Sequence, residues 1–175
     1  MMPKGSLVIF ETLSIKHLDR LLQFELENKT WFESKIPPRE CYFYSSAGLK
    51  MHIFDSMINM RSGTHYSGVL LFDDKIVARG NLKDMSLEHS CGTVGYRVAK
   101  ECTGKGYASY CLSQLIQIAN ERYCVNELKA LVLDNNPASK AVLQKLGFNA
   151  HSHEDDFIAH RGTKLGCTSF SRTSI

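Results

Sequence analysis

The sequence has no apolar run that approaches the roughly 20 residues needed to span a bilayer. Only about four apolar residues follow Met1 to Gly5 before Glu11 interrupts them, so an export signal is not expected either. The chain also lacks a block of basic residues, because its 21 Lys and Arg are interspersed with 18 Asp and Glu and leave a net charge of +3. These absences predict a cytoplasmic protein that binds neither membranes nor nucleic acid directly.

Cysteine pairs with the C-x-x-C spacing of metal and redox sites are missing as well. The six cysteines lie in segments with the pattern of regular secondary structure, which is typical of reduced thiols rather than of a disulfide scaffold. His151 and His153 have no cysteine pair at zinc-finger spacing, so no metal site is predicted. With 43% hydrophobic and 22% charged residues, the 175 residues are expected to form one domain that spans 1–175.

Short apolar runs and segments of helical periodicity follow one another along the chain, and this order predicts an α+β fold with a mixed sheet. Asp73-Asp74 separates two apolar runs and predicts a hairpin turn between them. Strands are expected at 6–12, 128–133, twice after Phe148, and as an antiparallel set at 65–72, 75–82 and 91–99. Helices are expected from near Ser14, within 42–60, at 107–123 and at 137–146.

Two of the expected helices have clear local signals. The first follows Ser14, a suitable N-cap, and its apolar stripe comprises Ile15, Leu18, Leu21, Leu22 and Leu26. The second has Asn136 as N-cap, Pro137 at its first position and Gly147 after its last turn. This makes 137–146 the best-defined element of the sequence.

The segment between the strand at 91–99 and the helix at 107–123 is suited to binding an anion. Its residues are Thr103, Gly104, Lys105, Gly106, Tyr107, Ala108 and Ser109. Glycines let the main chain approach phosphate oxygens, and the first turn of a helix has unpaired N–H groups, so a pyrophosphate would fit. The alternative is that the two glycines only form a tight turn.

Two better-known phosphate loops do not match this segment. A Walker A loop requires G-x-x-x-x-G-K-[ST], but Lys105 is followed by Gly106, and Ala99 stands where the first glycine belongs. The dinucleotide-binding pattern G-x-G-x-x-G has Ser109 in place of its last glycine, and the preceding strand belongs to an antiparallel set.

Three stretches of the sequence together resemble the GNAT acetyltransferases, and specifically the RimJ/RimL branch of ribosomal-protein N-terminal acetyltransferases. The family's loop pattern, Gln/Arg-x-x-Gly-x-Gly/Ala, is matched within 92–108 by Thr103-x-x-Gly106-x-Ala108, with its first position changed. The family's Asn-x-x-Ser followed by Leu-Gly-Phe is matched within 131–148 by Asn136, Ser139 and residues 146–148. The third stretch, 21–40, is a looser match.

The resemblance implies a single GNAT-like domain whose mostly antiparallel sheet is splayed at a cofactor cleft and flanked by helices. It implies acetyl-CoA as the donor, without a metal, and places its pyrophosphate on main-chain N–H groups from Thr103 through Ser109. The pantetheine arm would lie like an added strand beside Arg97, Val98 and Ala99. Asn136 would hold the amide region of the pantetheine.

Acetyl transfer to an amine requires a donor for the developing oxyanion and a proton for the departing thiolate. The resemblance assigns the oxyanion to the main-chain N–H of Val98. Many family members protonate the thiolate with a Tyr, but Leu143 stands at that position, and Ser139 is the expected substitute. The alternative for Ser139 is a local hydrogen bond in the first helical turn.

The general base is poorly defined, because Thr93 stands where related sequences often have Glu. Glu88, His89 and Glu11 are candidates that would act through water, or they are ordinary surface residues. At pH 7 an α-amine of pKa about 8 is about 10% neutral, whereas a lysine amine near 10.4 is only about 0.04% neutral. A weak base therefore favours an N-terminal α-amine as acceptor.

The residues leave several functions open. The first is an N-acetyltransferase of protein or peptide N-termini, such as those of ribosomal proteins, and the second is the same reaction on a small amine such as a polyamine or an aminoglycoside. A CoA-binding module without catalysis is a third, and a nicotinamide or flavin oxidoreductase is a distant fourth. The aromatic residues Trp31, Phe32, Tyr42, Phe43 and Tyr44 would line an acceptor groove or pack in the core, and the protein would be a monomer or a homodimer.

Overall fold

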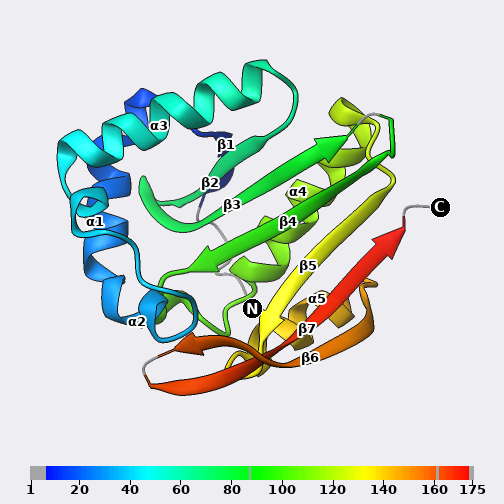
Figure 1. Cartoon of the computed structure of the whole chain (residues 1–175). Helices are drawn as coiled ribbons and strands as arrows, with labels where there is room; N and C mark the ends of the chain where they lie inside the picture. Colours follow the sequence, from blue (N-terminus) through cyan, green and yellow to red (C-terminus); the bar gives the residue numbers. More distant parts are fainter. Residues whose placement is uncertain (1–6, 87, 161, 174–175) are drawn as a thin grey trace.

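The computed structural model describes residues 7–86, 88–160 and 162–173, and within these ranges seven strands form one sheet in the order β1-β2-β3-β4-β5-β7-β6 (Figure 1). The strands are β1 (Val8–Thr12), β2 (Tyr66–Phe72), β3 (Lys75–Ser86), β4 (Cys91–Val98), β5 (Glu127–Leu133), β6 (Asn149–His160) and β7 (Thr163–Thr173). The α-helices are α1 (Leu18–Glu27), α2 (Lys29–Glu33), α3 (Ser46–Arg61), α4 (Tyr107–Tyr123) and α5 (Pro137–Lys145). Three 3-10 turns accompany them: η1 (Ile15–His17), η2 (Cys41–Tyr44) and η3 (Lys100–Cys102).

The sheet consists of two parts that share only a short contact. Strands β1 to β4 form an antiparallel meander, and β5, β7 and β6 form a second antiparallel set. Strands β4 and β5 are parallel and pair only at Cys91–Thr93 with Glu127–Lys129. Beyond these pairs the two strands separate, so the predicted α+β fold with a splayed, mostly antiparallel sheet is confirmed.

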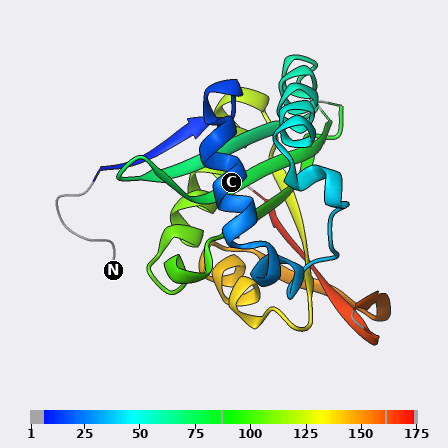
Figure 2. The ribbon, with the colours of Figure 1, turned by 90° about the vertical axis from the view of Figure 1, so that its left-hand side faces the viewer.

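Helices cover both faces of the meander (Figures 1 and 2). Helix α4 packs on one face of β3 and β4, where a Cβ on Gly80 would lie 2.6 Å from Leu115 of α4. Helices α1 and α3 pack on β3 and β2 from the other side. Because side chains alternate along a strand, Arg79, Asn81 and Lys83 project from β3 toward the face opposite that of Gly80.

The structure confirms the expected elements and corrects the apolar stripe of the first helix. Ile15 and Leu26 of the predicted stripe are 40% and 49% exposed, whereas Glu25 is completely buried. The helix ends at Glu27, where the side chain of Asn28 donates to Phe24 O at 2.9 Å and accepts from Lys100 N at 2.8 Å. Asn28 thereby ties α1 to the segment that follows β4. Ser6 of the first expected strand, like Met1 to Gly5, lies outside the described residues.

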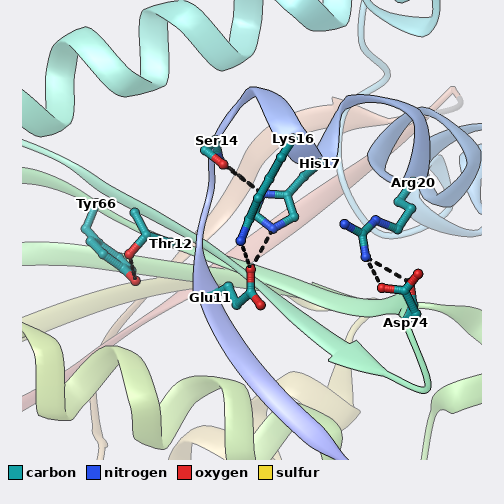
Figure 3. A network of polar contacts seen from close by, with 8 residues as sticks. All are labelled: Glu11, Thr12, Ser14, Lys16, His17, Arg20, Tyr66 and Asp74. Carbon is teal, nitrogen blue, oxygen red and sulfur yellow. Dashed lines mark hydrogen bonds and ion pairs between the residues drawn. The ribbon is translucent and has the colours of Figure 1, made fainter.

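A polar network fixes the turn from β1 into the helical segment (Figure 3). Glu11 Oε2 lies 3.1 Å from His17 Nε2 and 2.6 Å from Lys16 Nζ, and His17 Nδ1 accepts from Ser14 N at 3.1 Å. Because Nδ1 already accepts this N–H, the group is a helix cap rather than a nucleophile–base pair. Glu11 is therefore held on the edge strand β1, with β2 and β3 between it and β4.

None of the described helices combines the length and the apolar composition needed to cross a membrane.

Candidate active site

The separation of β4 from β5 opens a cavity of about 620 Å³. Its walls are β4 from Val94 to Val98 and β5 from Ala130 to Leu133, with α2, α5 and the loop after β4 around them. Of the predicted site residues, those that line the cavity are Arg97, Val98, Thr103, Gly104, Gly106, Ala108, Ser109, Asn136 and Ser139. Most of the residues singled out from the sequence are thus brought to one place.

The edge of β4 that faces the cavity has main-chain groups available for an added strand. Ala99 N donates to Val77 O of the neighbouring strand at 2.9 Å, and main-chain groups alternate between the two edges of a strand. The N–H and C=O groups of Val98 and Tyr96 therefore point toward β5, which has already diverged. Trp31 Nε1 donates to Val98 O at 3.2 Å from this side. An extended, amide-bearing ligand fits this edge.

The loop before α4 provides a cradle for an anion. Gly104 has a φ of +73° and Gly106 a φ of +92°, and a Cβ at either position would meet no atom within 4 Å. Gly106 is the N-cap of α4, so the unpaired N–H groups of the first turn follow it directly. The positive end of the helix dipole adds to this, so the arrangement suits an anion, as the sequence predicts for this loop.

Four predicted cofactor residues have side chains or N–H groups that are already engaged elsewhere or lie outside the cavity. The side chain of Tyr107 is buried and packs its ring 5.8 Å from that of Phe72. Ala99 is buried as well, and the exposed Lys105 does not line the cavity. Thr103 already donates both its N–H and its hydroxyl to Lys100 O. For an anion held by N–H groups the side chains at these positions therefore matter little, and the N–H groups of Ala99 and Thr103 are already in use.

Ser139 meets a partner that the sequence did not indicate. Tyr96 Oη lies 3.0 Å from Ser139 Oγ, across the cavity from β4 to α5. Burial raises the pKa of Tyr96 to about 12, so its phenol stays protonated at neutral pH. Asn136 Oδ1 caps α5 by accepting from Ser139 N at 3.3 Å, which leaves its predicted contact with pantetheine to Nδ2.

The side chain of Arg97 points away from the loop, to the face covered by α1. Its guanidinium donates to Glu25 Oε2 at 3.0 Å and lies 5.0 Å above the ring of Phe32. The N–H and C=O of Arg97 face β3, as those of Ala99 do, so its predicted contact with pantetheine stays a prediction without a free polar group of this residue behind it. Arg79 donates to the other oxygen of Glu25 at 2.8 Å, so one buried carboxylate joins β3 and β4 to α1.

A family described as acetyltransferase (GNAT) domain matches residues 8–149. The chain belongs to the GNAT acetyltransferase family. The resemblance seen in the sequence is thereby confirmed, and so is the enzyme class, an acyl-CoA-dependent N-acetyltransferase with acetyl-CoA as donor. A search of the curated proteins finds no match.

Several solved structures share the fold over nearly the whole chain. RimL, the ribosomal L7/L12 α-N-protein acetyltransferase solved with coenzyme A, has a TM-score of 0.89 at 16% identity and covers 99% of this chain and 97% of its own. The ribosomal-protein-S5-alanine acetyltransferase of Vibrio fischeri has a TM-score of 0.89 at 17% identity over 98% and 97%. The spermidine N-acetyltransferase of Vibrio cholerae has a TM-score of 0.80 at 15% identity over 95% of each chain. The structural likeness shows the common GNAT fold, and at such low identity it leaves the acceptor open.

The aromatic residues expected at the acceptor groove divide into two groups. Trp31 and Phe32 line the cavity of the acetyltransferase. Phe43 instead packs on Tyr44 and His52, with ring centroids 5.3 and 5.2 Å away. Tyr42 is 56% exposed.

The two other candidates for the general base also lie away from the cavity. Glu88 and His89 are exposed residues of the turn between β3 and β4, and neither lines the cleft of this acetyltransferase. Together with Thr93 in place of the usual Glu, this leaves the described cavity lining without a carboxylate.

Charged groups concentrate where the acetyltransferase cavity meets α1 and α3. Burial works to raise the pKa of the Glu25 carboxyl, but Arg79 and Arg97 outweigh it and the pKa falls below its usual value. Burial, followed by the charges of Arg79 and Arg39, lowers the pKa of His52 to about 3. His52 is therefore neutral, and its Nε2 accepts from Arg79 Nη2 at 2.9 Å.

The half-buried His52 predicts a loss of stability in mild acid. A histidine has a pKa of about 6.5 in the unfolded chain, and the lower pKa of His52 in the folded protein contributes to stability. This contribution is complete above about pH 6.5 and is lost as the pH falls from there toward about 3. The substitution His52→Gln keeps an acceptor for Arg79 but does not titrate. Urea unfolding at several pH values is expected to give a flatter pH dependence for His52→Gln between about pH 6.5 and 4.5. The exposed His89→Gln serves as control, and equal slopes for wild type and His52→Gln would contradict the assignment.

Proposed function

We propose that this acetyltransferase transfers the acetyl group of acetyl-CoA to the α-amine of a protein or peptide N-terminus. The charge of the cavity carries the proposal. Six cationic side chains line it and no carboxylate of the described residues does: Lys35, Arg39, Arg79, Lys83, Arg97 and Lys145. A polyamine, with several positive charges, would meet repulsion throughout such a cavity, whereas a single terminal amine can enter as the neutral base.

The same cations compensate for the missing general base. Nearby positive charges disfavour a protonated amine and so lower the pKa of an amine bound among them. An α-amine begins from a pKa of about 8 and a lysine amine from about 10.4, so the α-amine needs a much smaller shift to become neutral. The likeness to acetyltransferases of ribosomal-protein termini supports the same acceptor.

Each part of the site then has a role in the transfer. The loop from Thr103 to Ser109 would hold the pyrophosphate, and the free edge of β4 would align the pantetheine. The N–H of Val98 would donate to the carbonyl oxygen as negative charge develops on it. Ser139 Oγ, hydrogen-bonded to Tyr96, would donate the proton that the departing sulfur needs.

The proposed role of Ser139 predicts an effect on turnover rather than on binding. The substitution Ser139→Ala is expected to lower kcat about tenfold, below the usual 10²–10⁴ of a general acid, because a thiolate is a good leaving group. Tyr96→Phe removes only the partner of Ser139 and is expected to have a smaller effect in the same direction. Steady-state kinetics together with calorimetry of CoA binding would separate the two quantities.

The matched control for this prediction is Ser113→Ala on α4. Ser113 Oγ donates to Tyr110 O at 2.8 Å and does not line the cavity. An unchanged kcat in Ser139→Ala would reduce Ser139 to a residue that stabilises the first turn of α5.

An acceptor panel tests the proposed function directly. The protein would be incubated with acetyl-CoA and short peptides with free N-termini, the same peptides with blocked termini and an internal lysine, spermidine, or an aminoglycoside. Mass spectrometry is expected to find acetylation of the free α-amines. Turnover of spermidine with none of the peptides would overturn the proposal, and CoA binding without any acetylation would favour a non-catalytic module.

A further inference from the structure

Two cations of the cavity form no direct ion pair with a carboxylate of the described residues. Arg39 and Lys83 line the cavity, and among the described residues neither forms an ion pair with an acidic side chain. Arg39 instead lies 4.2 Å above the ring of Phe43. The carboxylate of Asp84, the residue after Lys83, acts on the pKa of Lys83 through its charge but forms no ion pair with it among the described residues. Their charges therefore remain available to a ligand.

The internal charge balance around these residues is strongly positive. Glu25 is the buried carboxylate of the cluster, and both of its oxygens are used by Arg79 and Arg97. Counting Arg39 and Lys83 with that pair gives four cations around one anion, a surplus of three. Partial burial of the Lys83 stem lowers the pKa of its amine, the charges of Arg39 and Arg79 lower it further, and Asp84 opposes them. An anion placed among them would relieve this mutual repulsion.

We infer that the preferred acceptor is a peptide N-terminus followed by acidic residues at its second or third position. This inference rests on the proposed function. The geometry of the strands sets this spacing. Lys83 pairs with Thr93, which lies three residues along β4 from Tyr96. Because a strand rises roughly 3.3 Å per residue, Lys83 lies about 10 Å along the strand from Tyr96 and its partner Ser139. An extended peptide covers that length in about three residues.

The direction of the side chains agrees with this assignment. Arg79 and Lys83 project to the face of the sheet covered by α1 and α3, whereas Ser139 and Tyr96 meet on the side of α5. An acceptor can therefore approach from the face opposite α4 and α5, with its amine toward the cleft and its acidic side chains among the cations. A purely structural role for Lys83 is less consistent with its position, because its side chain is exposed at the rim.

The test compares three peptides that differ only at their second and third residues: Ala-Asp-Glu, Ala-Asn-Gln and Ala-Lys-Arg at the start of one common sequence. For wild type we expect kcat/KM to be about tenfold higher for the acidic than for the neutral peptide at about 0.05 M salt, and this preference to shrink at about 0.5 M. For Lys83→Glu we expect the order of the peptides to reverse, with the basic peptide best. Arg39→Gln is expected to reduce the preference.

Matched controls separate this inference from the proposed function. Lys50→Glu carries the same charge change on the exposed side of α3, outside the cavity, and is expected to keep the order of wild type. Thermal unfolding and CoA affinity show whether each variant is folded.

Four outcomes decide between the alternatives. Equal kcat/KM for the three peptides, or the same order in wild type and Lys83→Glu, would overturn the inference while N-terminal acetylation stands. Acetylation of O-phosphoethanolamine in preference to every peptide would assign the cations to a small anionic amine and overturn the peptide as acceptor. If no peptide of any charge is acetylated although CoA binds, the proposed function itself fails. A reversed order of the three peptides in Lys83→Glu, with the order of wild type kept in Lys50→Glu, supports the inference.

Discussion

Replacing Glu25 by alanine is expected to lower the free energy of unfolding by about 3–5 kcal/mol, since it leaves two buried cations without their counter-charge. The side chain of Glu25 is completely inaccessible, and its two oxygens accept from Arg79 and Arg97 at 2.8 and 3.0 Å. Arg79 is itself only 3% exposed, so water cannot replace the lost carboxylate without a rearrangement of α1. Urea unfolding at neutral pH would measure the effect.

The control for this prediction lies on the same helix. Glu27 is exposed and accepts only from Gln23 at 2.7 Å, so Glu27→Ala is expected to change stability by less than about 0.5 kcal/mol. Glu25→Gln keeps the volume and one acceptor, and we expect an intermediate loss. A loss in Glu25→Ala as small as that in Glu27→Ala would show that the two arginines find other partners.

The substitution Gly106→Val is expected to weaken CoA binding about 100-fold, or roughly 3 kcal/mol. Gly106 has a φ of +92°, where a β-branched residue is strained, and its Cβ would enter the open space that the pyrophosphate is proposed to fill. The N–H groups of the first turn of α4 would then be moved or screened from the anion. Isothermal titration calorimetry with CoA measures this directly.

Gly63 offers a matched control for the backbone strain. It has a φ of +77°, its Cβ would also meet nothing within 4 Å, and it lies in the turn after α3, away from the cavity. Gly63→Val is therefore expected to lower the melting temperature about as much as Gly106→Val while CoA affinity stays at the wild-type value. Unchanged affinity in Gly106→Val would reject the loop as the pyrophosphate site.

The sequence predicted those parts of the site that depend on local patterns. The glycine loop consists of seven consecutive residues, 103–109. Asn136 and Ser139 lie three residues apart at a helix start that an N-cap and a proline indicate. Strand and helix positions followed from the same kind of information, because periodicity and capping are properties of short segments.

The parts that the sequence did not predict depend on contacts between distant segments. Tyr96 and Ser139 are 43 residues apart, and only the packing of α5 against β4 joins them. The burial of Glu25 does have a local sequence signal, because Glu25 lies four residues after Leu21, on the buried face of the helix. A carboxylate at such a position indicates a buried ionic cluster, but its partners Arg79 and Arg97 lie 54 and 72 residues away. Their identity required the structure.

The arrangement of β5 between β4 and β7 has a consequence for how the enzyme is made. Residues Ala130 to Leu133, one wall of the cleft, find their partners in β7, at positions 167 to 170. A ribosome makes these partners after the whole of the glycine loop, because they lie far beyond it along the chain. A nascent chain that ends before β7 would carry the loop without a stable wall opposite it, so we expect donor binding to begin only when synthesis of the C-terminal strand is complete.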